Sequence, residues 1–536
     1  MNTQNFDFIA RHAMVFDGTG RPPFEADVGV RGDRIAAVGD LSAVAAAEEV
    51  DASGRWLLPG LIDVHTHSDA FILIEPYAPS KLLQGVTTEI VGQCGGSAAP
   101  RLNNARLPSD WMAQTYPTRA GWPEVPGPNW TTVADYRTCF EAVGPAINMI
   151  LFAGHNTIRK GVMGDAPRAA KPEETAGMVR VLEQALDEGA WGLSTGLVYH
   201  PGVHSRPEEV EALVGACAKR GGMYATHMRS EGDRLLEAID EVLHLTQTTD
   251  IRTEISHLKT SGKANWHKLP AALEKIEAAR AAGMHVYSDR YPYLSAGTDL
   301  DIVLPDWAAA GGNDAICRRL DAPADARRIA ADIDASGRDP ATVMIGGTWS
   351  PENAPCGGRY LNELMDRFGL SMGETVVRIL RKDRSRTGAF FFGMCDENML
   401  TILKQPWVMA GSDASLRAPW GPLGRDWPHP RAYGTCPEFF RTLTQRLGIA
   451  PEEAIRRMTG LPALAFGIRD RGVIREGAFA DVVILDPLRW AGLSTYARPH
   501  IFAEGVDTVL VNGVREVCGG QINPAVRRSG RFLTRS

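Results

Sequence analysis

The sequence predicts an α/β fold: a TIM-like (β/α)8 barrel with a small β-sandwich domain formed by both chain termini, and an insertion between strands 7 and 8. Three observations support this. Short apolar runs alternate with amphipathic helical stretches through the middle of the chain. Both ends are rich in short strands and turns, and the stretch from about 299 to 400 fits neither pattern.

The barrel is predicted from eight strand-like runs that alternate with helices. Helical stretches such as Pro172–Glu188 and Pro207–Lys219 begin with acidic residues, which suit the positive end of a helix dipole. Eight parallel strands favour a closed barrel over an open sheet. The strands are Leu61–His67, Thr87–Cys94, Ile147–Gly154, Trp191–Gly196, Met223–His227, Arg252–His257, His285–Arg290 and Val408–Asp413.

The ends of the chain share one style of sequence, with short apolar runs separated by turns such as Asp17-Gly18 and Gly32-Asp33. Because the termini of a domain often lie close together, we expect residues 1–57 and 466–536 to form one β-domain. Two unrelated β appendages are the alternative. The barrel then covers 58–465, and its insertion at about 299–400 should form a lid or subdomain.

Composition limits the possible partners and location. The chain has 536 residues, 44% of them hydrophobic and 23% charged, with a net charge of −7 and no basic stripe. Nucleic acid and anionic membranes are therefore not expected partners, while an oligomer is possible. The first residues lack the regions of a signal peptide, and no window is apolar enough to span a membrane. Eight scattered cysteines fit a reducing compartment, so we expect a cytoplasmic protein.

Reactive residues of a barrel gather where its strands end, and polar side chains end several of the predicted strands. Imidazole and thiolate groups bind Zn²⁺ in preference to Mg²⁺ or Ca²⁺, so the set predicts a zinc site. Each residue also has an ordinary interpretation: the histidines as solvated or core side chains, Cys94 as a buried filler and Asp413 as a helix N-cap. The predicted metal ligands are His65, His67, Cys94, His227, His257 and Asp413.

These residues lie in motifs through which the chain resembles the D-aminoacylase (N-acyl-D-amino-acid deacylase) branch of the metal-dependent amidohydrolase superfamily. The resemblance covers nearly the whole chain. Its motifs include Pro-Gly-x-Ile-Asp-x-His-x-His at 59–67, Gly-x-Cys-Gly at 92–95, Thr226-His227-Met228-Arg229, Ser256-His257-Leu258-Lys259, Tyr291-Pro292-Tyr293, Gly411-Ser412-Asp413 and His429-Pro430-Arg431.

The resemblance implies a TIM-like barrel with a small β-sandwich and a hydrolase that releases a carboxylate and a D-amino acid. It implies one zinc ion held tightly by Cys94, His227 and His257, with an optional second ion near His65, His67 and Asp413. In the chemistry so implied, zinc polarises the amide carbonyl, while Asp413 deprotonates the attacking water and later protonates the leaving amine.

Family positions that bind the substrate carboxylate match Lys259, Tyr293 and Arg431, and an arginine offers a bidentate fork for that group. His155 follows the third strand, where it could contact substrate or make only a structural hydrogen bond. The sequence departs from the family pattern at Leu258, often a histidine, and in the loop with His200 and His204. These changes affect the expected acyl or side-chain preference rather than hydrolysis.

Three functions remain open from the sequence. The leading one is zinc-dependent hydrolysis of N-acyl-D-amino acids. A second keeps the site but cleaves another acylated amine, a cyclic amide or a lactone. A third is a non-catalytic metal-binding barrel scaffold, which should have lost ligands, whereas all six candidates are present here.

Overall fold

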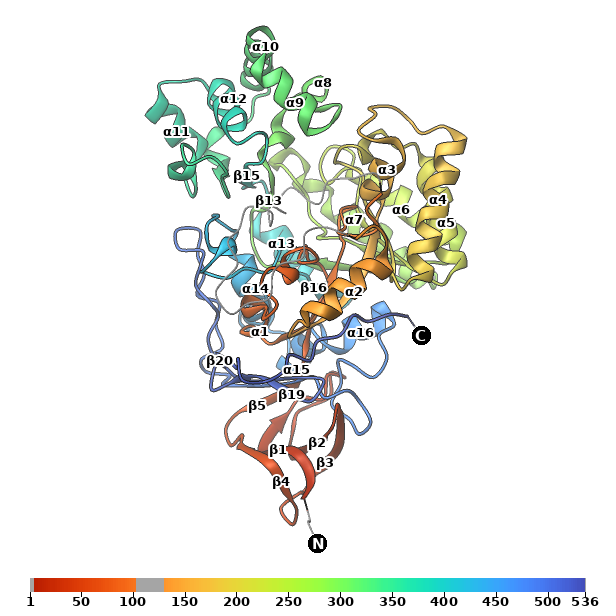
Figure 1. Cartoon of the computed structure of the whole chain (residues 1–536), viewed down its shortest axis with the longest axis vertical. Helices are drawn as coiled ribbons and strands as arrows, with labels where there is room; N and C mark the ends of the chain where they lie inside the picture. The colour runs from red at the N-terminus through yellow and green to blue at the C-terminus, as the bar shows by residue number, and fades with distance from the viewer. Residues whose placement is uncertain (1–3, 103–129, 536) are drawn as a thin grey trace.

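The barrel dominates the computed structural model, which describes residues 4–102 and 130–535 (Figure 1). Its eight strands are parallel and follow the chain order around the sheet. All eight candidate strands are confirmed. They are β6 (Leu61–Asp63), β7 (Val86–Val91), β8 (Asn148–Gly154), β9 (Gly192–Gly196), β10 (Met223–His227), β11 (Arg252–Ile255), β12 (Val286–Arg290) and β16 (Val408–Ala410).

Hydrogen bonds between the first and last strands close the barrel. The Val64 amide donates to the Ala410 carbonyl at 3.4 Å, and the Asp413 amide donates to the His65 carbonyl at 2.8 Å. The predicted first strand ran to His67, but regular pairing with β7 stops at Asp63. His65 and His67 therefore lie in the turn beyond the strand.

Helices cover the outside of the barrel. They include α3 (His155–Met163), α4 (Pro172–Asp187), α5 (Pro207–Lys219), α6 (Leu235–Thr249) and α7 (Leu269–Ala281).

 Proline at the first position and acidic residues in the first turn start α4 and α5, as expected from the sequence. The buried faces of these helices pack on strands that are buried apart from Arg252 at the start of β11, as is usual for a parallel sheet.

The two ends of the chain build one nine-stranded sheet, at the bottom of Figure 1. β5 pairs antiparallel with β17, so that Leu58 faces Val483 across the junction of the two ends. The sheet encloses its own apolar core, and we confirm a separate β-rich unit built from both termini. The boundaries at 57 and 466 stay predictions. The strands are β1 (Gln4–Val15), β2 (Phe24–Arg31), β3 (Arg34–Gly39), β4 (Ala45–Asp51), β5 (Trp56–Pro59), β17 (Val482–Leu485), β18 (Val506–Val511), β19 (Val514–Cys518) and β20 (Gln521–Ile522).

The insertion between β12 and β16 forms a subdomain with a core of its own, at the top of Figure 1. Three short strands, β13 (Ala296–Asp299), β14 (Val343–Ile345) and β15 (Gly388–Phe391), make its sheet. The expected bound near 400 is too late, because α13 (Asp396–Leu403) packs into the core of the barrel. The helices of the subdomain are α8 (Asp306–Ala309), α9 (Gly312–Asp321), α10 (Pro323–Asp334), α11 (Leu361–Phe368) and α12 (Met372–Lys382).

Candidate active site and metal centre

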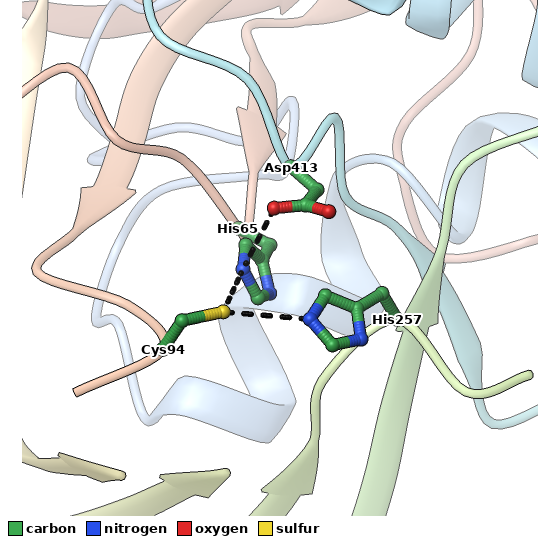
Figure 2. A group of neighbouring side chains, drawn as sticks. All are labelled: His65, Cys94, His257 and Asp413. Carbon is green, nitrogen blue, oxygen red and sulfur yellow. Dashed lines mark hydrogen bonds and ion pairs between the residues drawn. The ribbon is translucent and has the colours of Figure 1, made fainter. Parts of the chain in front are cut away.

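The predicted ligands converge on the thiol of Cys94 at the mouth of the barrel. Cys94 Sγ lies 3.3 Å from His65 Nε2, 3.4 Å from His257 Nε2 and 3.8 Å from His227 Nδ1. Figure 2 shows His65, Cys94, His257 and Asp413 pointing toward one another from separate segments of the chain. Potential ligand atoms of these four residues lie within 4.8 Å of one another. Strand ends far apart in sequence thus meet at one point.

One carboxylate oxygen of Asp413 contacts this cluster, and the other contacts a residue outside it. Its Oδ1 lies 3.0 Å from His67 Nε2 and 3.5 Å from His65 Nε2, while its Oδ2 lies 2.8 Å from Arg431 Nη1. The carboxylate therefore stands between the imidazoles and a guanidinium group. All six predicted ligands contact at least one other member of the set.

Three of these residues have backbone conformations that non-glycine residues rarely adopt. Cys94, His257 and Asp413 have φ angles of 53°, 38° and 49°. Such left-handed conformations are unfavourable and persist where the surrounding structure holds them, typically at functional sites. The turns after β7, β11 and β16 thereby aim their side chains at the centre of the barrel mouth.

Acidic residues behind the cluster orient the histidine rings, and sequence reasoning missed them. Asp289 Oδ2 lies 3.0 Å from His65 Nδ1, and Glu231 Oε1 lies 2.9 Å from His257 Nδ1. Each contact leaves the opposite nitrogen, Nε2, facing Cys94. Such carboxylates fix the tautomer and orientation of metal-binding imidazoles. Their positions were the only signal in the sequence: Asp289 lies on β12, and Glu231 comes four residues after His227.

The electrostatics of the cluster favour a thiolate. Burial alone would raise the pKa of the Cys94 thiol, but positive charge on His65 and His257 and hydrogen bonds with His227 and His257 hold that pKa well below its usual range. Burial would likewise raise the pKa of Asp413, yet Arg431 and His257 keep it well below its usual range. Anionic donors therefore exist at neutral pH.

These donors fit a metal ion. A thiolate, several imidazole nitrogens and a carboxylate form the kind of mixed sulfur, nitrogen and oxygen set that binds transition metals. Burial lowers the pKa values of His65, His67 and His257, but neighbouring anionic groups raise them above the usual range. Metal binding at such sites displaces protons from the ligands. His65, Cys94, His257 and Asp413 form the most compact group, with His67 and His227 beside it.

Of the residues predicted to contact substrate, some line the cavity and others do not. Arg431 lines the cavity beside the cluster and is buried, with Nη2 donating to the Gly297 carbonyl at 3.2 Å. Lys259 is buried too, but its Nζ forms an ion pair with Glu231 and lies 2.7 Å from His257 Nδ1. Arg431 is thus presented to the cavity, whereas Lys259 is held behind His257.

Tyr293 packs beside Gly434, and His155 makes the structural hydrogen bond that the sequence left open for it. A methyl group added to Gly434 on α14 (Arg431–Arg441) would lie 3.0 Å from the Tyr293 hydroxyl, so that hydroxyl points into the helix. His155 is fully buried, and its Nε2 lies 2.8 Å from Glu209 Oε1. Neither residue lines the cavity described here. Their surroundings do not support roles in substrate binding.

A cavity of about 1120 Å³ opens above the cluster. Its floor includes His67, Cys94 and Asp413, and its upper wall comes from the insertion. His200 also lines it and lies 3.0 Å from His204, whereas Leu258 is fully buried. The insertion therefore contributes to the wall of the cavity, and its role as a lid stays a prediction. Among its contributions are Thr298, Ile302, Gly347, Trp349, Arg386 and Phe390.

Comparison with known proteins identifies the family. The model of the amidohydrolase family matches residues 48–301 and 373–516. The chain belongs to the amidohydrolase family. The amidohydrolase match spans the barrel and part of the terminal sheet and omits residues 302–372 of the insertion.

Members of this family resemble the chain along almost its full length. An N-acyl-D-glutamate deacylase of Alcaligenes xylosoxydans xylosoxydans is 35% identical, over 99% of this chain and 97% of that protein. A solved D-aminoacylase, studied for its binuclear metal centre, has 34% identity and a TM-score of 0.82, covering 99% of this chain and 100% of its own. An N-acyl-D-glutamate deacylase of Bordetella bronchiseptica, solved with zinc and a phosphonate inhibitor, has 32% identity, the same TM-score and the same coverage of both chains.

No helix within residues 4–102 and 130–535 combines the length and apolar character that a membrane crossing requires.

Gly196 supplies a test of the cluster's geometry. A methyl group at this position would lie 2.0 Å from the carbonyl oxygen of Cys94, so Gly196→Ala should displace the thiol. We expect metal affinity, measured by competition with a chelator, to fall by about 10–100-fold. Gly215→Ala, on α5 with no atom within 4 Å of the added methyl, is the matched control and should keep its affinity. Wild-type affinity in Gly196→Ala would contradict the assigned role of Cys94.

Proposed function

We propose that this protein is a zinc-dependent hydrolase that cleaves the amide bond of N-acyl-D-amino acids to a carboxylate and a free D-amino acid. The position of Asp413 is the observation that carries this proposal. It contacts two candidate metal ligands through Oδ1 and Arg431 through Oδ2. A reacting amide and its neighbouring carboxylate need groups of these kinds side by side. Full-length similarity to deacylases of N-acyl-D-amino acids supports the same reaction.

The donor set supports zinc as the metal, because thiolate and imidazole favour Zn²⁺ over Mg²⁺ and Ca²⁺. We propose one tightly bound ion, with Cys94 and His257 among its ligands and His227 as a third. Since Cys94 Sγ also lies 3.3 Å from His65 Nε2, the same thiolate can serve a second ion near His65, His67 and Asp413. When bound, zinc supplies a Lewis acid for the amide carbonyl.

Asp413 is the proposed base. Its carboxylate is ionised and buried, and Oδ1 faces the imidazoles at the cavity floor. A water molecule at this floor would lose its proton to Asp413, and the protonated carboxyl would then deliver the proton to the leaving amine nitrogen. The Arg431 guanidinium holds Oδ2, which fixes the plane of the carboxylate.

Recognition of the substrate carboxylate is assigned first to Arg431, which lines the cavity and carries N–H donors beyond those that hold Asp413 and Gly297. Its guanidinium carbon lies 4.6 Å from the centre of the Tyr291 ring, and Tyr291 is fully buried. We therefore propose Tyr291, rather than Tyr293, as the tyrosine that supports this group. Lys259 contributes only if its ion pair with Glu231 opens.

The other functions have less support. Another acylated amine, a cyclic amide or a lactone would not need a cation such as Arg431 next to the base. A non-catalytic scaffold would not need six converging ligands. The eight cysteines are free, which supports a reducing compartment, and we propose the cytoplasm.

Turnover of paired enantiomers tests the proposed reaction. Zinc-loaded protein should release amine from N-acetyl-D-methionine or N-acetyl-D-glutamate and act far less on the L-forms. A chelator should abolish this activity, and added zinc should restore it. If the protein hydrolysed a hydantoin or a lactone but no N-acyl amino acid, the proposal would be wrong.

Replacement of the proposed base gives a second test. Asp413→Asn keeps the size of the side chain but cannot accept the proton, so kcat should fall by about 10²–10⁴-fold while most of the bound metal is retained. Asp306→Asn, a change at another carboxylate that lines the cavity, should stay within a few-fold of wild type. Near-normal activity of Asp413→Asn would exclude it as the base.

A further inference from the structure

A buried lysine links the two strands that lead to His65 and Cys94. Lys81 lies on the short helix α1 (Pro79–Leu82) and has no exposed surface. Its Nζ lies 2.9 Å from Asp63 Oδ2, on β6, and 2.9 Å from Glu89 Oε1, on β7. Both carboxylates are buried. Most lysines are exposed to solvent, whereas the charged group of Lys81 is buried and paired inside the barrel.

The same ammonium group holds both neighbours of Asp413. Lys81 Nζ donates to Ser412 Oγ at 3.0 Å and to the Ala414 carbonyl at 3.4 Å. Asp63 adds a further link, because its Oδ1 accepts a hydrogen bond from the Ser412 amide at 2.8 Å. The backbone on either side of Asp413 is therefore tied to one buried ion cluster.

Asp413 needs such support because its φ of 49° is unfavourable for a non-glycine residue. A strained conformation persists only where surrounding contacts hold it. The Asp413 amide donates to the His65 carbonyl at 2.8 Å, and the flanking contacts with Lys81 restrict rotation on both sides. If these contacts were lost, the carboxylate could turn away from His67.

We propose that Lys81 is a positioning residue that holds Asp413 in register with the metal-binding histidines. This inference rests on the proposed role of Asp413 as the base. A lysine suits the task because its three N–H donors can serve several acceptors at once. A neutral side chain of similar length would leave two buried carboxylates without a counter-charge.

Two variants test the inference. Lys81→Met removes the ammonium group and all its contacts, and Ser412→Ala removes one contact without leaving a buried charge. For zinc-loaded protein we expect kcat to fall by about 10–100-fold, since small displacements of a catalytic group have effects of this size. KM and the content of the tightly bound zinc should stay near wild type, because the substrate contacts and the proposed ligands Cys94, His227 and His257 remain.

Crystal structures of the metal-free variants provide a readout that is independent of activity. The distance from Asp413 Oδ1 to His67 Nε2, 3.0 Å in the wild type, should lengthen beyond hydrogen-bonding range. This measurement separates the two proposals. Inactive wild-type protein would refute the proposed reaction, whereas an unmoved Asp413 in both variants would refute the positioning role.

Arg471→Met is the matched control. Arg471 is buried in the terminal sheet, where it forms an ion pair with Asp481 and donates to Asn512 Oδ1 at 2.8 Å. Its loss should lower the melting temperature without changing kcat. If Lys81→Met and Ser412→Ala behaved in the same way, Lys81 would be structural only. Should Lys81→Met fail to fold, a wild-type kcat in Ser412→Ala would by itself overturn the inference.

Discussion

Closure of the barrel between its first and eighth strands is the constraint on which the site depends. The Asp413 amide donates to the His65 carbonyl at 2.8 Å, which brings a ligand from the start of the chain beside the proposed base from its last third. The ion cluster of Lys81 lies directly behind this seam. The seam that completes the barrel is therefore also the place where the ligands and the base are aligned.

Two further features shape the site: the balance of charges among its side chains and the wall that the insertion contributes to the cavity. Anionic Cys94 and Asp413 lie among imidazoles, so positive and negative groups compensate one another in a buried position. The insertion contributes the upper wall of the cavity and has its own core. Because residues of the insertion line the cavity while the candidate ligands follow barrel strands, changes in this subdomain can alter the cavity and leave the barrel unchanged.

The fold, and the convergence of the proposed ligands at one place, could be predicted from sequence because parallel strands end at one face of a barrel. The supporting residues could not. Lys81 lies in a short helical stretch, where a lysine is normally solvated, and only the tertiary structure shows its burial. Similarly, the conformation of the turn through Tyr291 and Tyr293 decides which of the two rings faces Arg431. The two tyrosines are separated by a single residue, and the sequence does not indicate which ring takes that position. His155 found a local partner, Glu209, that no spacing rule connects to it.

X-ray absorption at the zinc edge tests the central claim most directly, because it reports the atoms bound to the metal in the intact protein. Protein loaded with one equivalent of zinc should show a sulfur scatterer at about 2.3 Å together with nitrogen or oxygen neighbours. Cys94 is the thiol at the centre of the ligand cluster, so Cys94→Ser should remove the sulfur signal. A zinc spectrum of the wild-type protein with nitrogen and oxygen neighbours alone would contradict the account.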